Sequence, residues 1–324
     1  MKYLVEVNGL GGIVVKVVAF STSKQTGEDI ITFELTYPRI IHGEVMTHRL
    51  FSRNAASSRA IPVSMMNLLI SENTAMPVRF GMNKAGMQDT GERHSTPIEF
   101  NGVSYSPESA WYGAIEDAVK WSDAFDKAGY HKQVCNRLTE AGQFMRTVLT
   151  FTGAGENFYL LRNHGDADPT LAELARCMLE AHKQAVPVEL DVGDWHLPYY
   201  TAEDGTIGAW TMQGLKRKGI KGLKAAREIS ASCCAQASFR QLDDSQERAD
   251  RVFKRLVDSK PVHASPFEHQ ASPLHKDCGF RSKFVTAIDR FGNAWSGNFR
   301  NWGQWRQVIP GNVAEPVLPT LDKE

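Results

Sequence analysis

The first 36 residues constrain the fold most, because their apolar residues recur with the period of β-strands. Residues 3–20 predict a strand, a turn at residues 8–12 and a second strand. The glycines of that turn could instead form a phosphate loop. The β-branched residues that follow them are poorly suited to the helix that such a loop needs, so a hairpin is favoured. Ile31, Phe33 and Leu35 then alternate with polar residues, which predicts a half-buried strand.

Helical patterns dominate the middle of the chain. Ser106-Pro107 resembles the start of a helix, and the apolar spacing predicts that this helix continues to Gly129. A second helix is predicted at roughly 132–147, pairing with the first as an antiparallel hairpin. Further helices are predicted at 170–185 and 243–258. Residues 64–104 show no period and predict a long loop that covers another part of the protein.

Composition excludes several classes of protein. Among the 324 residues, Lys plus Arg and Asp plus Glu both number 37, so a general nucleic-acid binder is not expected. Five cysteines without a CxxC pair predict neither a disulfide framework nor a zinc ribbon. No apolar run reaches the roughly 20 residues that span a bilayer, and no signal-peptide core is present. We therefore expect a reduced, cytoplasmic protein without membrane partners.

The chain divides most simply after residue 200, where a polar stretch begins. This division gives a first part, 1–200, and a second part, 201–324, although the two could form one intertwined domain. Each part contains a dense polar segment.

The polar segment of the first part is 47–60, which holds three arginines, one histidine and three serines but no carboxylate. Arginine and serine side chains suit phosphate oxygens, and arginine keeps its charge at neutral pH. The alternative is an ordinary solvated basic turn. Because apolar segments lie on both sides, an anion-binding site is the favoured interpretation.

The polar segment of the second part is 263–269, with two histidines, a serine and a glutamate. Its spacing differs from that of zinc-binding helices, so no metal site is predicted. Two further segments carry candidate residues. Asn157 precedes Arg162 across an apolar run, and 295–310 holds amides and arginines among three tryptophans that could stack a ring or belong to the core.

Three of these segments resemble one family, the flavin-dependent (alternative) thymidylate synthases. The family signature reads Arg-His-Arg, two free positions, Ser, one free, Asn-Glu, one free, Ser, one free, Arg-Tyr. Six of its nine fixed positions match here, and the departures are Thr47, Ala55 and Ala60. The family motif His-Glu-Thr/Ser-Pro-Phe-Glu-His is similar to 263–269, and its Asn followed by Leu-Arg is similar to Asn157 and 161–162. The family order of the first two motifs is reversed, which suggests a permuted or partly duplicated member of the bacteriophage type.

The resemblance implies an α+β fold, with a mostly antiparallel sheet packed with long helices. It implies that FAD, NADPH and methylenetetrahydrofolate convert dUMP to dTMP in a homo-oligomer, a dimer or tetramer, with sites shared between subunits. Catalysis would involve Arg162, Ser57 and Arg59. The nucleotide would be held by Ser57, Ser58, Arg59, Arg137 and Arg162. The flavin would be held by His48, Arg49, Asn54, Asn157, His263, Ser265 and Glu268.

The sequence leaves other functions open. A family arginine falls at Asn136, with Arg137 beside it, and a family glutamine falls at Glu44, which would repel a phosphate. These departures favour two alternatives: a methylase or hydroxymethylase of another pyrimidine nucleotide, such as dCMP, or an inactive flavin- or nucleotide-binding relative. No cysteine lies beside a histidine or an obvious base, which disfavours a cysteine nucleophile.

Overall fold

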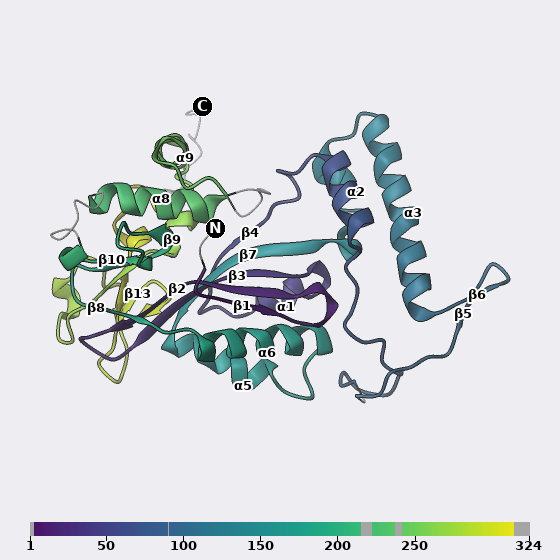
Figure 1. Cartoon of the computed structure of the whole chain (residues 1–324), viewed down its shortest axis with the longest axis horizontal. Coiled ribbons are helices and arrows are strands. Elements are labelled where there is room, and N and C mark those ends of the chain that lie inside the picture. Colours follow the sequence, from purple (N-terminus) through teal and green to yellow (C-terminus); the bar gives the residue numbers. More distant parts are fainter. Residues whose placement is uncertain (1–2, 90, 215–221, 237–241, 314–324) are drawn as a thin grey trace, which may run out of the picture.

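The structure, a computed structural model, describes residues 3–89, 91–214, 222–236 and 242–313. Its centre is a six-stranded sheet with the order β1-β2-β3-β7-β4, in which β8 pairs in parallel with the far end of β2 (Figure 1). All its other pairs are antiparallel. The strands are Val5–Asn8 (β1), Val14–Ser23 (β2), Asp29–Pro38 (β3), Ser52–Ala55 (β4), Phe144–Thr152 (β7) and Val188–Leu190 (β8).

The amino-terminal hairpin is confirmed. β1 pairs with β2 from Val5↔Val17 to Asn8↔Val14, and the connection is the 3-10 helix η1 (Leu10–Gly12). Gly11 and Gly12 have φ angles of 63° and 74°, a region that residues with a Cβ rarely adopt. The glycines therefore make the tight turn.

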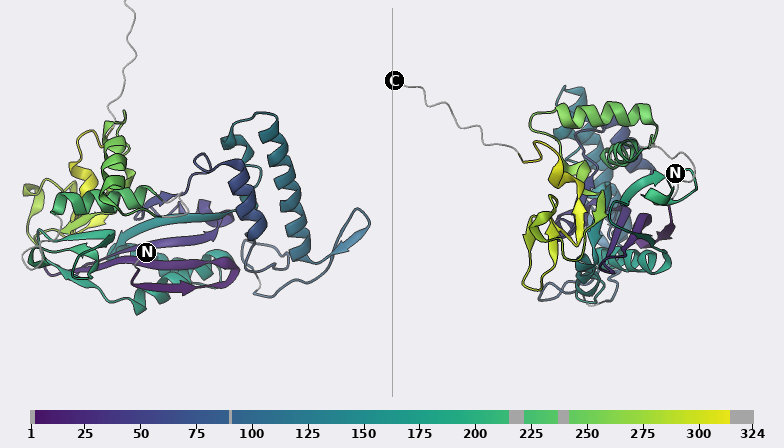
Figure 2. Two further views of the ribbon diagram at one scale, coloured as in Figure 1. Left: turned by 45° about the horizontal axis from the view of Figure 1, so that its top comes forward. Right: turned by 90° about the vertical axis from the view of Figure 1, so that its left-hand side faces the viewer.

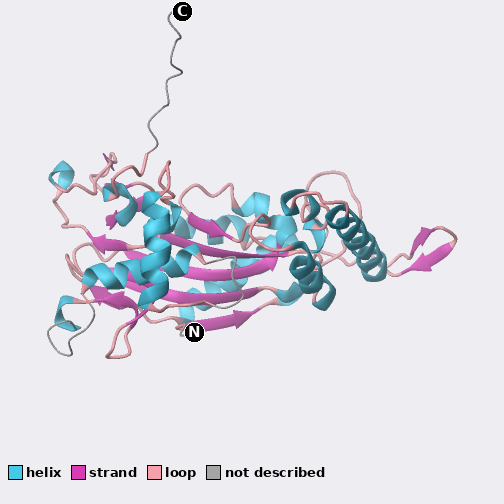
Figure 3. Ribbon diagram, turned by 90° about the horizontal axis from the view of Figure 1, so that it is seen from above, coloured by secondary structure: helices cyan, strands magenta, loops and turns pink. Residues whose placement is uncertain are grey.

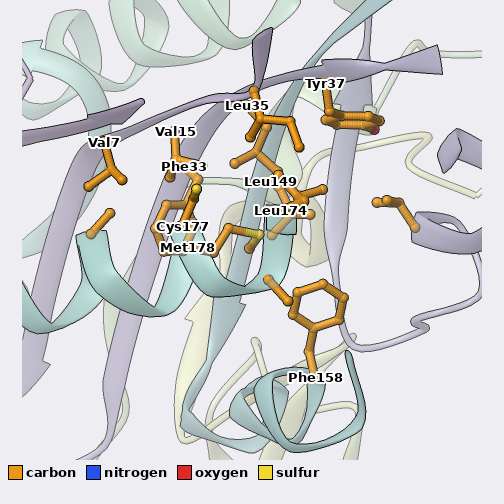
Figure 4. Packing of buried hydrophobic residues seen from close by; sticks show 14 of the residues in the cluster. Val7, Val15, Phe33, Leu35, Tyr37, Leu149, Phe158, Leu174, Cys177 and Met178 are labelled. Atoms are coloured by element: carbon orange, nitrogen blue, oxygen red, sulfur yellow. The ribbon is translucent and has the colours of Figure 1, made fainter. Parts of the chain in front are cut away.

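One face of the central sheet is covered by α6 (Pro169–Gln184), close to the predicted helix at 170–185. Asp168 caps its start, accepting hydrogen bonds from the backbone N–H groups of Thr170 and Leu171. Figure 4 shows Leu174 and Met178 of α6 packed against Phe33 and Leu149 of the sheet. This contact forms the larger apolar core.

The other face is covered by a second layer, which lies in front of part of the central sheet in Figure 3. It contains a four-stranded sheet of order β10-β9-β11-β15, a three-stranded sheet β12-β13-β14 and two helices. The elements are Trp195–Thr201 (β9), Ile207–Trp210 (β10), Ala271–Pro273 (β11), Ala287–Ile288 (β12), Ala294–Ser296 (β13), Phe299–Arg300 (β14), Trp302–Gln304 (β15), Leu223–Ala235 (α8) and Gln246–Asp258 (α9). The predicted helix at 243–258 is thus confirmed as α9.

The predicted division after residue 200 falls at the end of β9, just before the turn to its partner β10. It stays a prediction. Antiparallel sheets with packed helices confirm the α+β fold.

The prediction that β3 is half-buried is wrong. Ile31, Phe33 and Leu35 face α6, but Thr32 is 0% exposed and Glu34 only 7% exposed on the opposite face. Polar side chains on that face are satisfied by hydrogen bonds to the second layer: Tyr199 OH donates to Glu34 Oε2 over 2.9 Å. Polarity at alternate positions therefore does not mark a solvent face here.

A helical arm projects from one end of the sheet (Figure 2). It consists of α2 (Val63–Glu72), α3 (Pro107–Lys127) and a hairpin of β5 (Ile98–Phe100) and β6 (Val103–Tyr105). α3 confirms the helix predicted from Ser106, whose Oγ accepts from the Ser109 N–H. The prediction of an unbroken loop at 64–104 is wrong, because it overlaps α2 and the hairpin. The burial of Val63, Met66, Asn67 and Ile70 at helical spacing is the pattern that the sequence reading missed.

The prediction of a helix at 132–147 is also wrong. Helix α4 (Lys132–Cys135) ends after one turn, and β7 begins at Phe144. β7 lies between β3 and β4, and its residues 147–152 are all buried on both faces, so its apolar run lacks clear alternation. α3 packs against α2 instead.

Short helical segments connect the described elements: Arg39–Ile41 (η2), His42–Val45 (α1), Glu140–Gly142 (η3), Gly153–Glu156 (η4), Asn157–Arg162 (α5), Ser265–Glu268 (η5), Gly279–Arg281 (η6) and Trp305–Val308 (η7). Among the residues described, no helix combines the length and the apolar character needed to cross a bilayer.

Candidate functional site

The segment 47–60 lies at the edge of the central sheet and contains β4. Arg53, in β4, donates from its Nη1 to the carbonyls of Val45 (3.4 Å), Met46 (2.8 Å) and His48 (3.1 Å). These carbonyls belong to the end of α1 and the following turn, which a cation stabilises. Arg53 therefore shapes the turn that carries His48 and Arg49. It was not among the predicted site residues.

His48 and Arg162 are in direct contact, although they were predicted to bind different ligands. Arg162, the last residue of α5, donates from Nε to His48 Nε2 over 3.1 Å. The His48 ring also meets Phe158 edge-on, with centroids 4.8 Å apart. Burial, followed by the charges of Arg162 and Arg53, lowers the pKa of His48. The imidazole is thus held as a neutral acceptor for the arginine.

Arg162 also lines a cavity of about 640 Å³. Its walls come from the loop 77–89, the start of α6 at Asp168, and Glu44 of α1. Burial and the charge of Asp168 raise the pKa of Glu44, and Arg162 lowers it. The loop thus covers a chamber of the size of a small-molecule site, about 300–1,000 Å³.

Three residues predicted to hold the flavin meet at a smaller cavity. His48, Arg49 and Asn157 line a space of about 70 Å³. It is too small for a flavin ring system, since ligand pockets usually measure about 300–1,000 Å³. An exposed arginine with an amide and an imidazole suits phosphate oxygens. These residues would therefore suit the phosphate groups of the FAD expected from the sequence, but this cavity does not fit a flavin ring.

The segment 263–269 lies directly against β4, despite its distance along the chain. Gln304 of β15 joins the two: its Nε2 lies 3.2 Å from Ser52 Oγ, 3.1 Å from the Glu268 carbonyl and 3.0 Å from Asn298 Oδ1. Asn298 Nδ2 in turn donates to the Leu50 carbonyl over 3.0 Å. Two predicted motifs thus form one surface, bridged by amides whose role the sequence did not reveal.

Glu268 is the charged centre of this surface. Its carboxylate pairs with Arg306. Burial raises the pKa of Glu268, while the charges of Arg306 and Arg53 lower it. His263 is exposed, and its Nε2 lies 3.4 Å from Ser265 Oγ. Both residues therefore lie at the rim, where a ligand could reach them.

Asn54 and the nearby tryptophans have structural contacts. Asn54 Nδ2 donates to the Cys234 carbonyl of α8 over 3.2 Å, fixing β4 to the second layer. Trp302 and Trp305 are buried, with 0% and 6% exposure. Of the two roles considered for the tryptophans of 295–310, stacking on a ring or belonging to the core, these two belong to the core.

The turn carrying Ser57, Ser58 and Arg59 follows β4. Buried Asn136 holds it by donating from Nδ2 to the carbonyls of Ser58 (2.8 Å) and Ile61 (3.0 Å). Ser57 Oγ accepts from the Arg59 N–H over 3.3 Å, and the Arg59 side chain is exposed. Asn136, at the position of a family arginine, is therefore a scaffold for this turn.

Two further basic residues lie around the same turn. Lys132 Nζ lies 3.5 Å from the Ala60 carbonyl. Arg137 is exposed and 3.8 Å from Glu140. The sequence did not suggest Lys132 as a site residue, because the helix predicted at 132–147 was expected to pack against the preceding helix and not against residues 57–60.

The predicted nucleotide residues form two groups. Arg162 contacts His48 before β4, whereas Arg59 follows β4. The strand has four residues, so its first and last residues are roughly 10 Å apart at about 3.3 Å per step. Among the residues described, no hydrogen bond or ion pair joins Arg59 to Arg162.

No family model matches the chain, and no curated protein matches it. Among solved structures it is similar to the crystal structure of the UMP/dUMP methylase PolB from Streptomyces cacaoi bound with 5-Br UMP. The identity is 14% and the TM-score 0.42, over 56% of this chain and 93% of that one. A TM-score below 0.5 does not establish a common fold, so a function for this chain has to be supported by its own site.

Proposed function

We propose that the protein transfers a one-carbon unit from methylenetetrahydrofolate to C5 of dUMP, giving dTMP, with FAD and NADPH. One observation carries the proposal: the segments 47–60 and 263–269, which resemble two separate family motifs, lie against each other through β4, η5 and Gln304. In a chain where these motifs are far apart and in reverse order, chance similarity gives no reason for them to meet.

Arg162 would face the pyrimidine. Its Nε–H is used by His48, which orients the guanidinium and leaves the two terminal amino groups for a ligand. A fixed positive charge beside the ring stabilises negative charge that develops on it, and this makes C5 a better nucleophile. Arg162 thus acts by position and charge.

Ser57, Ser58 and Arg59 would hold the nucleotide phosphate, since hydroxyls and an exposed guanidinium suit its oxygens. These residues lie at the other end of β4 from Arg162. A site built from Arg162 of one copy and the Ser57–Arg59 turn of another would unite them, which supports a homo-oligomer with shared sites.

His48, Arg49, Asn157 and the 263–268 segment would hold the flavin. The bound flavin supplies the hydride chemistry that converts the transferred carbon to a methyl group. The chain contributes an anion-binding contact at Arg49 and a rim at His263 and Ser265.

A cysteine nucleophile is disfavoured by the pKa shifts. Burial raises the pKa of Cys177 to about 12 and raises that of Cys233, Cys234 and Cys278 as well. The thiolate is the nucleophilic form, so burial lowers the nucleophilic reactivity of these thiols at neutral pH.

The test is an assay of the purified protein with FAD, NADPH, methylenetetrahydrofolate and dUMP, with dTMP measured by mass spectrometry. We expect dTMP and a flavin spectrum that NADPH bleaches and air restores. Arg162→Ala should lower kcat/KM by about 10²–10³, the usual cost of removing one charge-stabilising donor. Arg255→Ala, an exposed arginine on α9, is the matched control. Absence of dTMP with a reducible flavin would reject dUMP as substrate.

Arg59→Ala separates the two ligand roles. It should abolish dUMP binding in calorimetry and leave the bound flavin unchanged. Loss of flavin with dUMP binding retained would show that the roles are reversed.

A second candidate is a methylase or hydroxymethylase of another pyrimidine nucleotide. Glu44 supports it, because this carboxylate lines the same cavity as Arg162 and would favour a ring with a hydrogen-bond donor, such as the amino group of cytosine. Product masses from dUMP and dCMP assayed side by side distinguish the two functions. An inactive relative would give no product from either.

A further inference from the structure

Three metal-ligand side chains meet on the α6 side of the central sheet. Asp29 is the first residue of β3, Glu156 is the last residue of η4, and His182 lies in α6. One potential ligand atom from each lies within 4.8 Å of the other two. Segments far apart in the sequence thus place two carboxylates and one imidazole around a common point.

Two of these side chains are held in place by neighbours. Asp29 accepts a hydrogen bond from Thr22 Oγ1. His182 Nδ1 lies 3.3 Å from the hydroxyl of buried Tyr159, and its ring meets Phe20 edge-on at a centroid distance of 4.9 Å. Histidines that bind metals usually have one ring nitrogen fixed in this way, which leaves the other nitrogen for the ion.

The local charge is negative and only partly balanced. Arg300 Nε lies 2.9 Å from both carboxylate oxygens of Glu28, so this guanidinium is already paired. In the part of the chain that the structure describes, neither Asp29 nor Glu156 forms an ion pair. A cation between the two carboxylates would balance their charge.

We propose that Asp29, Glu156 and His182 bind one divalent transition-metal ion. The imidazole favours Zn²⁺ over Mg²⁺ and Ca²⁺, which prefer all-oxygen sites, and the two carboxylates also suit Mn²⁺. Three protein ligands leave further positions for water. The ion would connect β3, the η4–α5 turn and α6, and it does not depend on the proposed function.

The test uses the full chain, freed of metal with a chelator and titrated with Zn²⁺, Mn²⁺ and Mg²⁺ by calorimetry. We expect one Zn²⁺ or Mn²⁺ per chain, weaker Mg²⁺ binding and a higher Tm with the metal. Glu156→Gln should weaken Zn²⁺ binding at least about tenfold, because even outer-shell changes cost 10–100-fold. Glu99→Gln, an exposed carboxylate on the projecting hairpin, is the matched control and should bind as the unsubstituted protein does.

The absorption spectrum of bound Co²⁺ tests whether the His182 imidazole is a metal ligand. Co²⁺ in the unsubstituted protein should give visible d–d absorption bands that change in His182→Gln. Circular dichroism checks that His182→Gln is folded. If it is not, the Zn²⁺ titration of Glu156→Gln provides the test, because Glu156 is exposed. No binding of Zn²⁺ or Mn²⁺, or binding that Glu156→Gln leaves unchanged, would overturn the proposal.

Discussion

The two faces of the central sheet are both buried, but by different interactions. The α6 face is apolar: Phe33 and Leu149 pack against Leu174 and Met178 with full burial. The opposite face carries hydroxyls, which meet histidines of the second layer. Apolar packing is non-directional, whereas hydrogen bonds fix distance and angle.

A chain of buried polar side chains crosses the second face. His196 of β9 joins Ser21 (Nδ1 to Oγ, 3.0 Å) to Thr32 (Nε2 to Oγ1, 2.9 Å). Thr32 Oγ1 lies 2.7 Å from Thr150 Oγ1, which lies 2.8 Å from His269 Nδ1. These contacts tie three strands of the central sheet to two segments of the second layer.

His269 connects these buried hydrogen bonds to the candidate site. It directly follows η5, and its Nε2 has no hydrogen-bond partner among the residues described, so Thr150 holds the ring. The polar face therefore fixes the position of 263–268 beside β4, while the apolar face supplies mainly stability. Three predictions test this division of roles.

The largest effect is expected on the apolar face. Phe33→Ala should lower the free energy of unfolding by about 3–5 kcal/mol, because it removes a fully buried ring and leaves a cavity. Glu34→Gln is the matched change on the polar face, since its amide oxygen still accepts from Tyr199, and should cost less than about 1.5 kcal/mol. Urea unfolding measures both. Equal losses would contradict the assignment of stability to the α6 face.

The second effect is a pH dependence that comes mainly from the polar face. Burial lowers the pKa of His269 to about 3, and burial together with the charge of His269 lowers that of His196 to about 3. Unfolding restores values near 6.5, so the unfolded chain binds more protons below that pH. The two neutral histidines therefore contribute fully to the free energy of unfolding above about pH 6.5. As the pH falls below that value, this contribution is lost at about 1.4 kcal/mol per pH unit for each histidine.

Urea unfolding at pH 7.5, 6.5 and 5.5 measures this slope. His269→Gln removes one of the two histidines whose pKa is lowered to about 3 and should make the slope shallower, whatever it does to stability at pH 7.5. His263→Gln, an exposed histidine, should leave the slope unchanged. A slope that His269→Gln does not alter would place the pH dependence elsewhere.

The same comparison explains how much of the fold could be predicted. The hairpin, α3, α6 and α9 follow local signals, such as the Ser106 cap and the apolar stripe of α6, and these survive in the structure. β7 was mistaken for helix because its pairing with β3 and β4 is non-local. The burial of Thr32 and Glu34 depends on partners over a hundred residues away, which no local pattern contains.

Prediction of the site has a similar limit. The segments 47–60 and 263–269 were recognisable from their side chains, but their contact depends on Gln304 and Asn298 from the tryptophan-rich segment. Arg53 looked like one more anion-binding arginine, and only the carbonyls at the end of α1 reveal its structural role. No sequence motif marks the cluster of Asp29, Glu156 and His182, because its residues come from three separate elements.

The smallest effect is expected from Thr150→Val, which keeps the shape of the side chain and removes the hydroxyl between Thr32 and His269. Two buried polar groups lose a partner, so we expect a loss of about 1–3 kcal/mol in the free energy of unfolding. Thr201→Val, a half-exposed threonine on β9, is the control and should stay within about 0.5 kcal/mol.

The decisive measurement on Thr150→Val is ligand affinity. If the polar face positions 263–268, freeing the His269 ring should weaken flavin or dUMP binding by about 2- to 10-fold, which corresponds to roughly 0.4–1.4 kcal/mol. Val15→Ala on the α6 face is the comparison, because it costs a similar amount of stability, about 1–3 kcal/mol, without touching the second layer. Affinity should fall in Thr150→Val and stay unchanged in Val15→Ala. Equal losses in both would mean that affinity follows overall stability, and that the polar chain does no more for the site than the apolar core does.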